Sequence, residues 1–125
     1  MKELNLHSLP NALVIINNFC LEHKLPKEVC LNINLVCEEL IVNLLSYNQS
    51  KTFDLELETN HDFVKIVIRY KGNKFDPTQP ATPENKSVEE MRYGGLGLVL
   101  VNSLATKINY RYHQKQSVNV VEVIL

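Results

Sequence analysis

The spacing of apolar residues changes near the middle of this chain, and that change limits the folds open to it. Between residues 8 and 47 the apolar positions fit helices. From Phe53 to Arg69 they alternate with charged residues in two runs, which the turn sequence Asn60-His61-Asp62 separates. This alternation predicts an antiparallel hairpin with one polar face. Helices followed by strands favour an α/β sandwich over an all-helical chain.

Local signals set the ends of the elements in the first half. Ser8 can cap a helix and Pro10 fits its first turn, and Pro26 opens a second helix that ends near Tyr47. The expected elements are a short strand over residues 2–7, helices over residues 8–23 and 26–47, and strands over residues 53–58 and 64–69.

The second half begins with a long irregular segment. Residues 71–93 keep no period and contain a cluster of prolines. Roughly twenty irregular residues in a small domain usually form a lid or a binding loop. Gly94-Gly95-Leu96-Gly97 then opens an apolar helix over residues 98–105. Strands over residues 108–112 and 118–125 follow, and we expect residues 1–125 to form one domain.

Charge and cysteine content limit the expected partners and compartment. The chain has 13 Lys and Arg against 14 Asp and Glu, which argues against a generic basic surface for nucleic acid. No apolar run approaches the roughly 20 residues that span a bilayer, and the N-terminus has no long apolar segment of a secretory signal. Cys20, Cys30 and Cys37 have no CxxC spacing, which favours buried reduced thiols. We therefore expect a cytoplasmic protein that binds neither nucleic acid directly nor a membrane.

A polar stripe lies on the second predicted helix. At 100° per residue, Asn32, Glu39 and Asn43 point within about 20° of one direction, and apolar residues flank them on both sides. A buried carboxylate is costly unless it has a partner. The stripe therefore indicates either a functional site or a structural feature, such as a capped polar network or a helix end near solvent. Periodicity favours neither.

The glycine-rich turn at residues 94–97 also has two interpretations. Free N–H groups and the helix dipole favour phosphate at such a helix start. Glycines before a helix also serve tight turns. No lysine follows the glycines, which excludes a P-loop, and a loop precedes them, which excludes a Rossmann fingerprint.

The order of these features is more specific than any one of them. Glu39-x-x-x-Asn43 precedes a strand that runs into Tyr70-Lys71-Gly72-Asn73-Lys74-Phe75-Asp76-Pro77, and the loop, Gly94-Gly95-Leu96-Gly97-Leu98 and a terminal strand with Asn119 follow. From about residue 5 to residue 125, the chain resembles the anti-sigma-factor serine kinase family of the gyrase–histidine kinase ATP-binding superfamily. The resemblance implies the Bergerat-type ATP-binding fold, a two-layer sandwich with helices on one face of a mixed, mostly antiparallel sheet.

The resemblance implies roles for individual residues. Glu39 matches the family's general base, which takes a proton from a substrate serine or a water. Asn43 matches the family's Mg²⁺-binding asparagine. Residues 78–93 match the lid, in which Lys86 or Arg92 would reach the phosphates of ATP. The implied nucleotide-binding residues are Asn43, Tyr70, Gly72, Lys86, Arg92, Gly94, Gly95, Leu96 and Gly97.

Tyr70 departs from the family's pattern, which has an aspartate here that binds the adenine amino group. Tyr70 shares a strand face with Ile66 and Ile68, so we expect it to point inward. A hydrogen bond to a charged group contributes about 1.5–3 kcal/mol, and its loss would weaken ATP binding roughly tenfold to a hundredfold. A phenol oxygen can still accept a hydrogen bond, which would keep part of this affinity.

The resemblance leaves two functions open. The first is an ATP- and Mg²⁺-dependent protein serine kinase that acts as an anti-sigma factor by partner switching. Its implied partners are a sigma factor, an antagonist protein and a second copy of the chain. The second is a non-catalytic interaction module of the same fold, with weak or no nucleotide binding. Glu39, Asn43 and the glycine-rich segment at residues 94–97 favour the first function, and Tyr70 favours the second. A released two-component kinase domain is disfavoured, since no helix carries a phospho-acceptor histidine.

Overall fold

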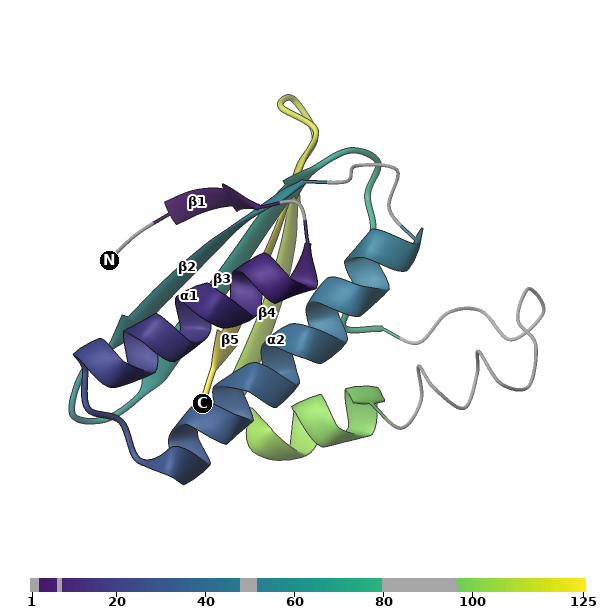
Figure 1. Cartoon of the computed structure of the whole chain (residues 1–125). Coiled ribbons are helices and arrows are strands. Elements are labelled where there is room, and N and C mark those ends of the chain that lie inside the picture. Colours follow the sequence, from purple (N-terminus) through teal and green to yellow (C-terminus); the bar gives the residue numbers. More distant parts are fainter. Residues whose placement is uncertain (1–2, 7, 48–51, 80–96) are drawn as a thin grey trace.

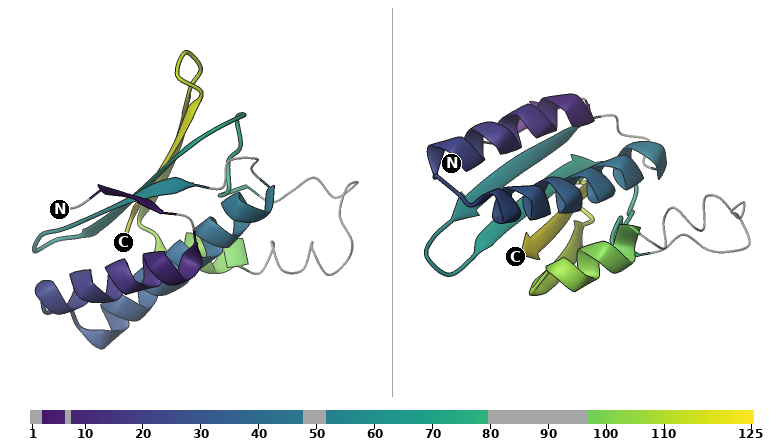
Figure 2. Two further views of the ribbon diagram at one scale, coloured as in Figure 1. Left: turned by 45° about the horizontal axis from the view of Figure 1, so that its top comes forward. Right: turned by 60° about the horizontal axis from the view of Figure 1, so that its bottom comes forward.

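The computed structural model describes residues 3–6, 8–47, 52–79 and 97–125. In these residues, helices cover one face of a five-stranded sheet, and Figures 1 and 2 show the two layers. The elements in chain order are β1 (Glu3–Leu6), α1 (Leu9–Glu22), α2 (Lys27–Tyr47), β2 (Phe53–Thr59), β3 (Val64–Lys71), a helix over residues 97–104, β4 (Lys107–His113) and β5 (Val118–Ile124).

The strands lie in the order β1-β2-β3-β5-β4, and each described pairing is antiparallel. The last strand of the chain therefore lies inside the sheet, between β3 and β4. Its register places Asn119 opposite Tyr70 on one side and opposite Tyr112 on the other. The predicted sandwich with helices on one face is confirmed.

The helix ends follow the predicted signals closely. The Ser8 side chain accepts a hydrogen bond from the backbone N–H of Asn11 at 3.4 Å, and Pro10 lies in the first turn of α1. α2 begins directly after Pro26 and ends at Tyr47. Serine and proline act locally at a helix start, so their effect can be read without knowledge of the rest of the fold.

The core lies between the helices and the sheet. Alternate residues of β2, β3 and β5 point into it, as period-two strands require. Burial of this apolar surface is the main favourable contribution to folding. The fully buried core residues include Ile16, Ile33, Val36, Leu40, Leu44, Leu55, Ile66, Val121 and Val123.

α2 is long and apolar enough to cross a membrane if length and composition alone are considered. Residues Lys27–Ser46 have a mean hydropathy of 1.5. This helix packs on the sheet, however, and Ile33, Val36 and Leu40 have no exposed surface. A core helix has the same composition, so its place in the sandwich accounts for its hydropathy. The sequence prediction placed this helix but considered only unbroken apolar runs, so it did not anticipate that the helix is apolar enough to span a bilayer.

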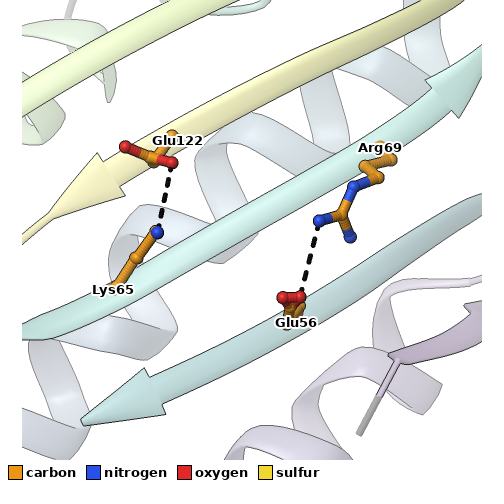
Figure 3. A network of polar contacts seen from close by, with 4 residues as sticks. All are labelled: Glu56, Lys65, Arg69 and Glu122. Atoms are coloured by element: carbon orange, nitrogen blue, oxygen red, sulfur yellow. Dashed lines mark hydrogen bonds and ion pairs between the residues drawn. The ribbon is translucent and has the colours of Figure 1, made fainter. Parts of the chain in front are cut away.

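The face of the sheet away from the helices carries ion pairs between strands (Figure 3). Lys65 pairs with Glu122 at 3.4 Å, and Arg69 pairs with Glu56 at 3.4 Å. Val67 lies between Lys65 and Arg69 on β3 and is only 5% exposed. Long charged side chains cover apolar surface with their aliphatic stems, which explains this burial without a second layer.

The turn between the helices brings two cysteines together. Cys20 near the end of α1 and Cys30 in the first turn of α2 form a disulfide, and their Cα atoms are 5.9 Å apart. The prediction of reduced thiols is therefore wrong for this pair, because helical periodicity does not show how two helices are joined in space. Cys37 is a free thiol and fully buried, as predicted.

Candidate functional site

Two segments that are distant in sequence contact α2. They are the loop after β3 and the start of the helix over residues 97–104 (Figure 1). The structure describes five of the predicted site residues, which are Glu39, Asn43, Tyr70, Gly72 and Gly97. The other five, Lys86, Arg92, Gly94, Gly95 and Leu96, lie outside the described residues.

The Glu39 side chain lies against Gly97. A Cβ atom added at Gly97 would overlap the carboxyl carbon and both carboxyl oxygens of Glu39. Any larger residue at position 97 would therefore displace this carboxylate, which is the flexible end of its side chain. The glycine expected to admit phosphate also makes space for the predicted general base.

Among the described residues, one oxygen of the Glu39 carboxylate lacks the partner that a structural role would require. Its Oε2 atom is buried and has no hydrogen bond within the part of the chain that the structure describes. Burial, and then the charge of Glu38, raise the pKa of Glu39 above its ordinary value. A carboxyl group with a raised pKa that lacks a partner is typical of functional sites. The geometry thus favours the functional interpretation of the α2 stripe over a capped network.

Asn43 lies one helical turn after Glu39 and is 6% exposed. Its Nδ2 donates a hydrogen bond to the backbone carbonyl of Pro77 at 3.2 Å, which ties α2 to the loop after β3. A hard cation would bind the amide oxygen instead. No cluster of His, Cys, Asp or Glu among the described residues could hold a metal. A single neutral amide oxygen such as that of Asn43 suits Mg²⁺ as a ligand that shares the ion with phosphate oxygens.

Tyr70 points into the core, as strand alternation predicts, and is 2% exposed. Its hydroxyl donates a hydrogen bond to the backbone carbonyl of Phe75. Burial, and then Tyr110 and Asp76, raise the pKa of Tyr70, so the hydroxyl keeps its proton. The protonated hydroxyl of Tyr70 can thus donate the hydrogen bond that fixes Phe75 in the loop after β3.

The side chain of Asn119 in β5 forms hydrogen bonds with the same loop. Its Oδ1 accepts hydrogen bonds from the backbone N–H of Phe75 at 3.0 Å and from the Tyr110 hydroxyl. Its Nδ2 donates to the backbone carbonyls of Asn73 at 3.2 Å and Tyr70 at 3.3 Å. A side-chain amide has two acceptor and two donor positions, so Asn119 is saturated.

The loop is also fixed at its first glycine. Gly72 has φ of 133°, a conformation that favours glycine, and its N–H donates to the Ser117 carbonyl at 2.9 Å. The Tyr112 hydroxyl donates to the Gly72 carbonyl at 3.1 Å. Sequence reasoning predicted a strand over residues 108–112 but did not find the roles of Tyr110 and Tyr112. Their partners depend on β5 lying between β3 and β4.

A cavity of about 710 Å³ opens on the β4 side of the helix over residues 97–104. Glu39 and Asn43 do not line it. Asp76 is the one charged residue among its described lining, and its Oδ1 accepts a hydrogen bond from the backbone N–H of Thr78 at 2.9 Å. A phosphate placed next to this carboxylate would be repelled by its charge. The described lining residues are Asp76, Thr78, Gln79, Leu98, Val99, Asn102, Ile108 and Tyr110.

Comparison with known proteins agrees with this fold. The family model of the histidine kinase-like ATPase domain matches residues 3–125. No curated protein matches the sequence. A chain in the crystal structure of the SiaB-SiaC complex from Pseudomonas aeruginosa is similar, with a TM-score of 0.65 and 9% sequence identity. The match covers 100% of this chain and 89% of that chain. At this identity, the likeness shows a shared fold.

Proposed function

This chain belongs to the histidine kinase-like ATPase domain family, and on that premise we propose that it regulates a sigma factor by partner switching. In this proposal it acts as an anti-sigma factor of the serine kinase type. The carrying observation is the carboxylate of Glu39, one turn before Asn43 and against Gly97, whose Oε2 atom is buried and has no hydrogen bond among the described residues. The similar structure of a two-protein complex supports a role in protein binding.

ATP with Mg²⁺ would supply the phosphoryl group in this proposal. Asn43 would bind the cation through its amide oxygen. Glu39 would take the proton from a serine hydroxyl of the antagonist protein. Its raised pKa makes the ionised carboxylate a stronger base, provided that the working pH keeps it ionised. Because Gly97 has no side chain, the Glu39 carboxyl group can occupy the position next to it.

A second function, a non-catalytic interaction module, is favoured by the loop after β3. Tyr70 stands where the family has an adenine-binding aspartate, and its hydroxyl is engaged by Phe75. Asn119 is saturated by Phe75 and Asn73 of the same loop together with Tyr70 of β3 and Tyr110 of β4. A nucleotide would have to displace these bonds to reach either group. In this case the protein would bind its partners with weak or no nucleotide binding.

Titration with a non-hydrolysable ATP analogue, with and without Mg²⁺, separates the two functions. The kinase proposal expects binding that Mg²⁺ strengthens, and Asn43→Ala should abolish the Mg²⁺-dependent part. Glu39→Gln should keep the binding, because Glu39 acts on the hydroxyl and not on the nucleotide. Absence of analogue binding by the unmodified chain would contradict the kinase and favour the interaction module.

The proposal also includes a homodimer in the cytoplasm, with a sigma factor and an antagonist protein as partners. The family resemblance supports this assembly. Sedimentation velocity over a wide concentration range tests it directly. A monomer at the highest concentration would remove the homodimer and leave the proposals about Glu39 and Asn43 unaffected.

A further inference from the structure

α1 packs against α2 and against the sheet beneath both helices. Ala12 and Ile16 have no exposed surface, and Phe19 is 9% exposed. On the outer side, Asn34 of α2 donates a hydrogen bond to Asn17 of α1 at 3.4 Å, a long and weak contact. A covalent link between the two helices would add to this packing and make separation of α1 less frequent.

The Cys20–Cys30 disulfide is such a link. It joins the last turn of α1 to the first turn of α2 across the connection at residues 23–26. In that connection, Lys24 has a φ of 54°, which is unfavourable for a residue with a side chain, and the N–H of Leu25 donates to the Cys20 carbonyl at 3.0 Å. The crosslink holds both ends of this turn.

The two sulfur atoms differ in their surroundings. Cys20 is 6% exposed, whereas Cys30 is half-buried. The Asn34 amide donates to the Cys30 sulfur at 3.6 Å. An external thiol would therefore reach the bond at Cys30, and Cys20 would be the sulfur left inside.

We propose that Cys20 and Cys30 form a reversible redox crosslink that sets the local stability of α1. The crosslink closes by exchange with a low-molecular-weight disulfide such as glutathione disulfide. The Cys30 thiolate attacks one glutathione sulfur, which forms a mixed disulfide and releases one glutathione thiolate. The Cys20 thiolate then attacks the Cys30 sulfur and releases the second. The two cysteine protons pass to the two glutathione thiolates, and reduction runs the same steps backwards.

Cys37 provides a control within the same molecule. It lies on α2, only seven residues after Cys30, but it is fully buried. Burial raises the pKa of the Cys37 thiol to about 12, so it forms little thiolate at neutral pH. Glutathione buffers should therefore act on Cys20 and Cys30 and leave Cys37 unmodified.

The test equilibrates the whole chain in glutathione buffers, traps free thiols by alkylation, and reads each cysteine by mass spectrometry. Cys20 and Cys30 should oxidise together, while Cys37 is alkylated only after unfolding. Hydrogen exchange of the same samples should be roughly tenfold to a hundredfold slower over residues 9–22 in the crosslinked form. The melting temperature should be about 5–10 °C higher in that form.

Two variants complete the experiment. Cys30→Ser should abolish both the crosslink and the redox dependence of exchange in α1, whereas Cys37→Ala should keep them. Stable glutathione adducts on Cys30 without the internal bond would overturn the proposal. Equal exchange of residues 9–22 in the oxidised and reduced wild-type chain would also overturn it. That second measurement needs no variant, so it stands even if Cys30→Ser folds poorly.

Discussion

The two polar regions beside α2 are built in opposite ways. Around Glu39, a buried carboxyl oxygen has no partner among the described residues. Around Asn119, all four hydrogen-bonding positions of a buried amide are filled by the molecule itself. An unpartnered buried group destabilises the fold and remains available for chemistry, whereas a saturated network stabilises the fold. We therefore propose the Glu39 region as the functional one, whereas the Asn119 region positions the loop.

Asn119→Ala should have the largest effect on stability, because it breaks the saturated network. It leaves the N–H of Phe75 and the carbonyls of Asn73 and Tyr70 without this partner, and should reduce the free energy of unfolding by about 3–4 kcal/mol. Urea unfolding measures this loss.

Asn109→Ala is the matched control for that variant. Asn109 lies on the neighbouring strand β4 and is exposed, so its removal should change the free energy of unfolding by less than about 0.5 kcal/mol. Equal losses from the two variants would show that Asn119 does not hold the loop.

Tyr70→Asp should increase the affinity of the protein for nucleotide. It restores the aspartate of the family pattern and should bind a Mg–ATP analogue about 10–100 times more tightly than the unmodified chain, or about 1.5–3 kcal/mol. Calorimetric titration measures the difference. Equal affinity of the two proteins would mean that the phenol oxygen serves the nucleotide, and tight binding by the unmodified chain would favour the full kinase.

Gly97→Ala should lower the pKa of Glu39 and have only a small effect on the free energy of unfolding. The new methyl group would push the carboxylate toward solvent, so the pKa of Glu39 should fall toward its ordinary value. The free energy of unfolding should change by less than about 1 kcal/mol, because the displaced group is flexible and alanine favours helix. NMR titration of the Glu39 carboxyl checks the shift, and an unchanged pKa would contradict the contact.

Glu39→Gln should give the smallest effect, visible as a pH dependence. The folded state raises the pKa of Glu39, so it favours the protonated form and loses stability as pH rises through that pKa. Glutamine does not titrate, so its stability advantage over the wild type should be larger at pH 7 than at pH 4. Unfolding curves at both pH values test this, and a constant difference would show that Glu39 is not desolvated.

The sequence predicted the helices and strands better than it predicted the contacts between them. Ser8 and Pro26 set helix starts through local bonds, and strand alternation placed Tyr70 inward, because these effects depend on neighbours in the chain. The contact of Glu39 with Gly97 joins residues that are far apart in sequence. No periodicity shows such a contact, since it depends on how the elements pack.

Dependence on how the elements pack also explains why the sequence did not predict two further features. The saturation of Asn119 depends on β5 lying between β3 and β4, which is a property of topology. The pairing of Cys20 with Cys30 depends on the path of a four-residue connection, whose Lys24 takes a conformation rare for lysine. The predicted role of Glu39 as a general base stays a prediction, as do those of Asn43 and Gly72 in nucleotide binding.

The tyrosines around the loop after β3 have an optical consequence. The chain has five tyrosines and no tryptophan, and Tyr70, Tyr110 and Tyr112 each bond to that loop or its anchor. Without tryptophan to mask it, near-ultraviolet circular dichroism and intrinsic fluorescence come mainly from tyrosine. The unlabelled protein thus contains its own spectroscopic reporter of whether the loop is seated on the sheet or released from it.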